Sequence, residues 1–572
     1  MSGLRTELGQ LNILSRHFFG RMFRNETVDF EDQMKERLIV ALTLLAVFFA
    51  WSSQLLMFKY HFVPDANRSW QEKNYIFTLM MLVFAVVTLL EWDVLFPDRQ
   101  DFSNLMPLPV RLRTMFAAKL VSFVLFIGMF SVAMTSVSSV LFAYYLAEWR
   151  AHRAVLVVVV RYILSHILAG FAANFAVFFS FVFLQSFLMA VIPPGLYRQV
   201  SLLVRFVLIT ALVFLLFGFV AQPSMLGGSF RSLETLKETG APFLLRYPPL
   251  WFVGLYEVFV GTGDPLFEAQ ACTGGLVLLL SLAAFAASSA LSYHRHVRRT
   301  LEVRKGRPPL FRFREVWRSF LSRTVLRAPE ERAVFGFFSE TLRTSGKHRM
   351  SLAYYLAVGS AMILILAVSY RESFRALTPA NGFFLVQPLL LVFALVAGIR
   401  VLVDRPAAPE ANWVFRLTET PRIAKYLTGL KKSVLIGLIL PLFGLVFALH
   451  AWLWDARTAF LHAGFGLVIS VLAVEAAFYR YRKVPFACTY VPGKLKLQFT
   501  AIPVLIGLPL AMMALAAIEK TILRDPGRGI AFLAVAAAAL FAMRFGNRTF
   551  YRTKPLLFEE HPDAAMVTFP ES

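Results

Sequence analysis

Long apolar runs alternate with short polar segments along the whole chain, and charged residues or clusters of Gly, Pro, Asn and Asp bound these runs. A helix needs about 20 apolar residues to cross a bilayer core about 30 Å thick. The pattern therefore predicts an all-α polytopic membrane protein. Its twelve predicted spans lie near residues 38–58, 75–95, 120–146, 163–192, 200–220, 274–293, 351–369, 382–403, 434–453, 460–479, 501–518 and 530–544.

The apolar stretch 154–192 is too long for a single span, and Arg161 and His166 interrupt its first part. Charged and polar groups inside a bilayer are costly unless they find partners. We therefore expect an interfacial or re-entrant piece ahead of the span itself.

Basic residues are concentrated in alternate loops, which predicts the side of the membrane that each loop faces. Lys and Arg are retained on the cytoplasmic side, and they are dense before residue 38, over 96–119 and above all over 294–349. Both termini are therefore expected in the cytoplasm. No small-residue cleavage site follows the first apolar run, so we expect that span to be retained. The sparser outside loops are 59–74, 221–273, 370–381 and 519–529.

The composition agrees with lipid as the main solvent of this chain. Hydrophobic residues make up 58% and charged residues 16%, whereas soluble domains are about 45–50% apolar and about 25% charged. Two cysteines among 572 residues cannot build a disulfide framework. The net charge of +23 is concentrated in the predicted cytoplasmic loops, so it indicates membrane orientation rather than a nucleic-acid partner.

A basic segment containing Pro308 and Pro309 divides the chain into two sets of six spans. An even number of spans gives both halves the same orientation, as in a parallel duplication. Each half begins with apolar residues at helical spacing ahead of its first span. The predicted parts are an amphipathic connecting helix (1–37), a first six-span half (38–293), a linker with a second connecting helix (294–350), a second six-span half (351–545) and a cytoplasmic tail (546–572).

The loop after the second span has the same features in both halves. An Asp-Arg pair lies where the chain leaves the membrane, and a segment that mixes apolar, Pro and basic residues follows. Positive-inside loops alone explain the basic residues but not their matched positions. The residues concerned are Asp98, Arg99, Arg111 and Arg113 in the first half and Asp404, Arg405 and Arg416 in the second.

The predicted outside loop 221–273 is too long for a simple connection. It contains the aromatic-rich apolar stretch 247–259, which is too short to span a bilayer. A re-entrant gate buried in protein and an interfacial helix explain this stretch equally well. The candidate gate residues are Pro249, Trp251, Tyr256 and Glu257.

Polar side chains within the spans form a further set of candidates, because a charge at the bilayer centre costs about 2.5–3.5 kcal/mol on insertion scales. Interhelical hydrogen bonding is the commoner use of buried amides, and a charge near a span end can reach the interface. The candidates for an intramembrane polar pathway are Asn174, Gln185, Gln387 and Glu475.

Motifs for catalysis are missing from the sequence. Gly346 and Gly493 precede lysines, but neither pair has the earlier glycine or the following Ser or Thr of a phosphate-binding loop. The ten histidines show no His-Glu-x-x-His spacing, and no Gly-x-Ser-x-Gly elbow occurs. We therefore expect no enzyme activity, metal site or cofactor in this chain.

The order of these features resembles the membrane subunit of an ABC transporter of the ABC-2 class, the type V exporters, with two six-span halves fused in one chain. The likeness in topology covers most of the sequence. The short outside loop 519–529 departs from the pattern, so a re-entrant element is expected in the first half only. The segments that carry the resemblance are 97–119, 248–257, 412–417 and 485–494.

The resemblance implies a permease subunit, in a bacterial inner membrane and surrounded by lipid, that works with separate cytoplasmic ATPase subunits. Two ATPase subunits are expected for one copy of this chain, and ATP and Mg are expected on them. The loops 97–119 and 404–431 would transmit the motion of the ATPases to the spans. No nucleic-acid partner is implied.

Two other functions stay open. An ion-coupled secondary transporter needs carboxylates near the midplane at broken helices, and no acidic residue is placed convincingly at that depth by the sequence. A membrane scaffold would use the same cytoplasmic loops without any substrate-dependent ATPase. The many Phe residues suit hydrophobic substrates, but they also fill helix interfaces and face acyl chains.

Overall fold

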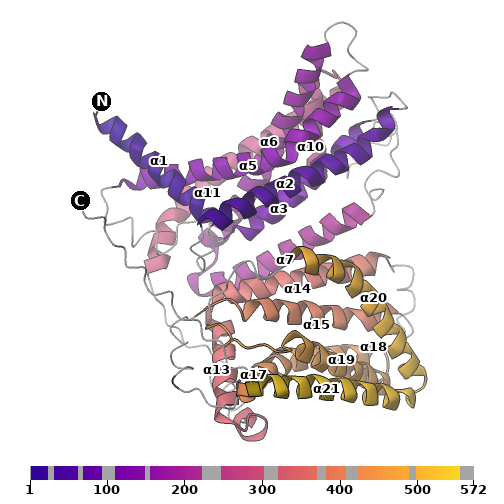
Figure 1. Ribbon diagram of the computed structural model, residues 1–572. Helices are drawn as coiled ribbons and strands as arrows, with labels where there is room; N and C mark the ends of the chain where they lie inside the picture. The colour runs from indigo at the N-terminus through magenta and orange to yellow at the C-terminus, as the bar shows by residue number, and fades with distance from the viewer. Residues whose placement is uncertain are drawn as a thin grey trace. The chain divides into compact units, whose positions relative to one another are not determined.

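The computed structural model describes residues 2–23, 31–61, 69–92, 110–147, 155–221, 246–301, 320–369, 382–407, 417, 423–487 and 497–553. Within these ranges there are sixteen α-helices and no strands (Figure 1). Eleven of the described helices are long and apolar enough to cross a membrane, by length and composition. The prediction of an all-α polytopic membrane protein is confirmed.

Eleven of the predicted spans coincide with these helices. The remaining predicted span, 501–518, lies inside helix α20 (Leu497–Arg524) and carries no Asp, Glu, Lys or Arg. The side chains of residues 501–510 lie outside the described set, so this span remains a prediction.

The expected interruption of the stretch 154–192 is wrong. Helix α6 (Val155–Val191) runs unbroken over 37 residues. Both polar residues find partners: Arg161 Nε donates to the backbone oxygen of Phe259 at 2.7 Å, and Nε2 of the buried His166 lies 2.9 Å from the Ser138 hydroxyl. A helix can carry such residues when neighbouring elements satisfy them.

The chain divides into two compact units, Met1–Arg304 and Lys305–Ser572, and the division falls within the segment 294–350. The helices of the first unit are α1 (Ser2–Phe23), α2 (Glu31–Met57), α3 (Trp70–Leu90), α5 (Leu112–Ala147), α6, α7 (Pro194–Ala221), α10 (Pro248–Val260) and α11 (Pro265–Leu301), with the short 3-10 helix η1 (Phe58–His61) after α2.

The second unit is also helical, and α13 runs across one end of its long helices (Figure 1). Its helices are α13 (Pro329–Thr344), α14 (Gly346–Ser369), α15 (Gly382–Leu402), α17 (Ile423–Val434), the π-turn η6 (Leu435–Ile439), α18 (Leu440–Leu453), α19 (Ala456–Ala477), α20 and α21 (Arg528–Thr553).

The two units repeat one pattern of helix packing. In the first unit α1 packs on α5, α3 on α6 and α7, and α6 on α5 and α11. In the second unit α13 packs on α17, α15 on α19 and α20, and α19 on α18 and α21. These helices, which occupy the same places in the order of each unit, therefore make corresponding contacts, whereas α2 packs mainly on α5 and its counterpart α14 mainly on α15. The short helix α10 is additional to this pattern, since α20 and α21 of the second unit are joined directly by residues 525–527.

The third span of the second unit contains a π-turn between α17 and α18. Pro441 lies in the first turn of α18, and a proline inside a helix removes a backbone donor and clashes with the carbonyl four residues earlier, here that of Gly437. The wider π-turn accommodates this clash without ending the helix.

Candidate functional site

The amphipathic helix α1 packs on the first turns of α5. Leu14 and Phe18 of α1 are buried against Met115, and the Lys119 ammonium lies 5.6 Å from the centre of the Phe18 ring. The apolar face that the sequence predicts for this segment is therefore partly used against another helix, although Leu8 remains 59% exposed.

Arg111, which immediately precedes α5, pairs with Glu7 of α1 at 2.5 Å. The Arg111 side chain is 79% exposed, and exposed ion pairs contribute little to stability. Most of this guanidinium is therefore accessible to a partner. Among the other coupling candidates, Asp98, Arg99 and Arg416 lie outside the described residues, and so does the side chain of Arg113.

Helix α13 packs on α17 in the corresponding way. Lys432 of α17 pairs with Glu331 of α13 at 2.6 Å and also donates to the backbone oxygen of Val325 at 2.8 Å. A Cβ on Gly429 would lie 2.9 Å from the Glu331 Cα, so the two helices approach this closely only because glycine is present. Each unit thus joins its amphipathic helix to its third span through a Glu and a basic residue.

Asp404 and Arg405 lie just after the end of α15 and make contacts within the second unit. The Asp404 carboxylate accepts from Arg400 at 2.6 Å and from the Tyr481 hydroxyl at 2.9 Å. Arg405 Nη1 donates to the Ser351 hydroxyl of α14 at 2.9 Å. These two candidates fix the end of α15 to its neighbours.

The gate candidates lie on α10, a helix of 13 residues with clear local signals at both ends. Pro248 and Pro249 occupy its first turn, where no intrahelical donor is needed. Gly261 ends it in the left-handed conformation (φ 81°), which glycine adopts at little cost. A Cβ there would also lie 2.5 Å from an Arg161 guanidinium nitrogen.

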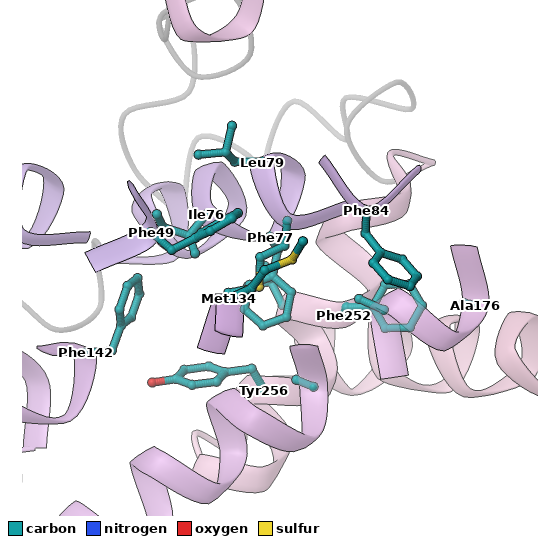
Figure 2. Close-up of a cluster of buried hydrophobic side chains, with 14 of the residues drawn as sticks. Phe49, Ile76, Phe77, Leu79, Phe84, Met134, Phe142, Ala176, Phe252 and Tyr256 are labelled. Atoms are coloured by element: carbon teal, nitrogen blue, oxygen red, sulfur yellow. The ribbon is translucent and has the colours of Figure 1, made fainter. Parts of the chain in front are cut away.

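Helix α10 is buried between α3, α6 and α11. Figure 2 shows Phe252 and Tyr256 of α10 in one cluster with Phe77 and Phe84 of α3. Pro249, Tyr256 and Glu257 are buried and Trp251 is half-buried. This packing meets the requirement that a re-entrant element be covered by protein, and the gate remains a prediction.

A buried ion pair fixes α10 to α3. The Lys73 ammonium contacts the Glu257 carboxylate, and the two side chains are only 3% and 4% exposed. The same ammonium lies 4.8 Å from the centre of the Tyr256 ring, and the Thr262 hydroxyl donates to the second carboxylate oxygen. The charges are therefore satisfied on several sides, as burial requires.

Tyr247, the residue before α10, makes a second connection to α3. Its hydroxyl donates to the Thr78 hydroxyl at 3.1 Å. Burial raises the pKa of Tyr247 to about 12, and the hydrogen bond with Thr78 opposes this shift in part.

The polar-pathway candidates of the first unit have interhelical partners. Asn174 of α6 donates to the Ser131 hydroxyl of α5 at 2.9 Å, and Gln185 of α6 donates to the backbone oxygen of Trp92 at 2.9 Å. The two amides are 11 residues apart along α6, a rise of about 16 Å.

In the second unit, Gln387 Nε2 lies 3.5 Å from His450 Nε2, and Glu475 accepts from Lys431 of α17 and Arg544 of α21. Glu475 thus connects three helices. No hydrogen bond within the described ranges joins two of the four pathway candidates to each other, and a continuous pathway remains a prediction.

The structure brings together acid-base pairs that the sequence did not predict. Lys73 pairs with Glu257, and His462 pairs with Glu519, although each pair links two separate helices. No spacing along one helix could reveal them. The available signal was a charge directly beside a predicted span, as at Lys73 and Glu519.

Metal ligation is not indicated by the described side chains, among which no three His, Cys, Asp or Glu residues form a group that could hold an ion. Comparison with known proteins gave no match to a family model, to a curated protein or to a solved structure. A functional interpretation therefore depends on the sequence and on the geometry above.

Proposed function

We propose that this chain is the membrane-spanning permease subunit of an ATP-driven exporter of the ABC-2 class, working with two separate cytoplasmic ATPase subunits that bind ATP and Mg. We further propose that the membrane is a bacterial inner membrane. Both termini would lie in the cytoplasm, because the distribution of Lys and Arg favours that side. One copy of this chain would supply both six-span halves.

The observation that carries the proposal is the repeated contact between an amphipathic helix and the start of the third span. It occurs as α1 on α5 and as α13 on α17, each with a Glu-to-basic pair. A cytoplasmic loop that transmits the motion of an ATPase needs a rigid connection to the spans. In this proposal the paired helices provide that connection in each unit.

Arg111 is the described residue best suited to contact an ATPase. Its guanidinium is largely exposed, and arginine suits exposed carboxylate partners because of its planar, bidentate geometry. Its equivalent in the second unit, Lys432, is 26% exposed and is held by Glu331 and Val325. Of these two basic residues, Arg111 is the more accessible.

The test begins with purification of the full-length chain from its native membranes, followed by identification of any co-purifying subunit with a phosphate-binding loop. Reconstitution of the two in liposomes then measures ATP hydrolysis with and without this chain. Stimulated hydrolysis supports the proposal. Association without stimulation supports a scaffold instead, and transport driven by an ion gradient without ATPase supports secondary transport.

Three variants separate contact with the ATPase from the pairing of Arg111 with Glu7. R111E places like charges at the proposed interface and should weaken ATPase binding about tenfold or more. E7Q removes only the intramolecular pair and should leave binding unchanged. E7K/R111E restores that pair with reversed charges and should still bind weakly; recovery of binding in this double variant would assign Arg111 a structural role alone.

A further inference from the structure

The second unit contains a buried acid and base that are not used by the function proposed above. Glu519 of α20 lies 2.5 Å from Nδ1 of His462 on α19, and each side chain is 1% exposed. The remaining polar atom of each side chain, His462 Nε2 and Glu519 Oε2, is buried without a hydrogen-bond partner. Two proton acceptors are therefore vacant at one buried site.

A second histidine lies beside this pair. The ring centres of His450 and His462 are 4.8 Å apart, and Trp454 lies 4.3 Å from His450 and 5.6 Å from His462. His450 Nδ1 is 2.9 Å from the backbone oxygen of Val446, which can only accept, so this nitrogen carries a hydrogen. In the neutral ring the other nitrogen, Nε2, is then the basic atom.

The charge of the His462–Glu519 pair changes with a single proton. A neutral His462 beside an ionised Glu519 leaves one uncompensated negative charge in a buried site, which is costly. One added proton makes the pair neutral overall, whichever of the two side chains carries it. Histidine is the side chain whose ordinary titration falls between pH 5 and 8.

The groups around the pair come from the helices that pack on α19. α15 contributes the neutral Gln387 and Phe384, which lie against His450 of α18, and α20 contributes Glu519 itself. The next residue of α20, Lys520, is half-buried, and Arg524 of α20 is exposed. The described charged partners from α17 and α21 are engaged with Glu475, which is 13 residues beyond His462, a rise of about 20 Å. On α19 itself, Asp455 and Arg457 are exposed.

The first unit pairs its buried carboxylates with lysines. Its fourth span also carries a buried histidine, His166, whose Nε2 is 2.9 Å from the Ser138 hydroxyl of α5 rather than beside a carboxylate. The buried acids there, Glu72 and Glu257, contact Lys59 and Lys73. Among the buried carboxylates of the described residues, Glu519 is the one whose ion-pair partner is a histidine.

We propose that the His462–Glu519 pair of the second unit is a proton-binding site, with His450 as the neighbouring acceptor. One proton binds at the vacant nitrogen of His462 or the vacant oxygen of Glu519, and no other reactant is needed. The site would make the second unit responsive to pH. It does not depend on the presence of an ATPase.

Trp454 provides a direct reading of this proton, because a protonated imidazole in contact with an indole quenches its fluorescence. The fluorescence of the full-length protein in lipid nanodiscs is measured from pH 9 to pH 5. The protein has nine tryptophans, so the emission of the W454F variant is subtracted to leave the signal of Trp454. We expect one transition in the difference signal. A flat difference signal over this range would overturn the proposal.

Matched variants assign the transition. E519Q removes the negative charge beside His462 and should lower the midpoint by about 1 to 3 pH units, whereas E340Q, at an exposed site on α13, should leave it unchanged. If E519Q does not fold, H462K tests whether the transition belongs to the His462–Glu519 pair. This variant places a lysine beside Glu519 and should abolish the wild-type transition. A midpoint unchanged in E519Q, or a wild-type transition that persists in H462K, contradicts the proposal.

Discussion

Lys73 and Glu257 form an ion pair across 184 residues of sequence, and both side chains are almost completely removed from solvent. The pair connects α3 to α10, the short helix that has no counterpart between α20 and α21. The position of α10 therefore depends on a charged contact as well as on apolar packing.

Neutralising one member of this pair should be more damaging than neutralising both. K73M leaves the Glu257 carboxylate buried without its cation, so we expect a loss of about 3–5 kcal/mol in the free energy of unfolding. K73M/E257Q removes both charges and should recover most of that loss. Unfolding of the reconstituted protein in denaturing detergent measures the difference. R343M, which breaks the exposed pair with Glu340, is the control and should cost about 0–1 kcal/mol.

Substitution of Gly254 should disturb the packing of α10 on α11. A Cβ at this position would lie 2.6 Å from the Gln270 Cβ and 2.7 Å from the backbone oxygen of Phe267, which cannot move aside freely. G254A should therefore cost about 1–3 kcal/mol through overpacking. Gly275 has no atom within 4 Å of its Cβ position, so G275A should be stable in the same thermal unfolding assay. Equal losses in the two variants would contradict the close approach of the helices.

Substitution of Gly429 should separate α13 from α17. The added methyl group would lie 2.9 Å from backbone atoms of Glu331, and the Lys432–Glu331 pair depends on the same approach. We expect G429A to lower stability by about 1–3 kcal/mol, and to increase protease cleavage near α13. G444A on α18, whose Cβ would meet no atom within 4 Å, is the matched control. Cleavage at the wild-type rate in G429A would argue against a rigid joint.

Ionisation of Tyr247 should weaken the connection between α10 and α3 at alkaline pH. Burial raises the pKa of this phenol to about 12, above its ordinary value of 10.0, so the folded state favours the protonated form. The contribution to stability is complete below pH 10 and is lost as the pH rises toward 12. Y247F should remove this part of the pH dependence, measured as the difference in melting temperature from wild type between pH 9 and 11. Parallel curves for the two proteins would refute it.

Local sequence signals predicted the elements that depend on one segment at a time. The spans follow from apolar length, and the apolar stretch 247–259, which is too short to span a bilayer, forms most of the short helix α10. The same signals failed at α6. Arg161 looks like an interruption in sequence, but its guanidinium donates to Phe259, and only the fold brings that carbonyl within reach.

The sequence by itself determined that this is a chain of apolar helices in two sets, because helix length and hydrophobicity are local properties. The tertiary structure decided which polar groups meet. Glu257 faces a lysine, Glu519 faces a histidine, and each partner comes from another helix. No spacing along the chain could therefore distinguish a carboxylate paired with a lysine from one paired with a histidine. That distinction is made by burial, since the cost of an unpaired charge arises only once water is excluded.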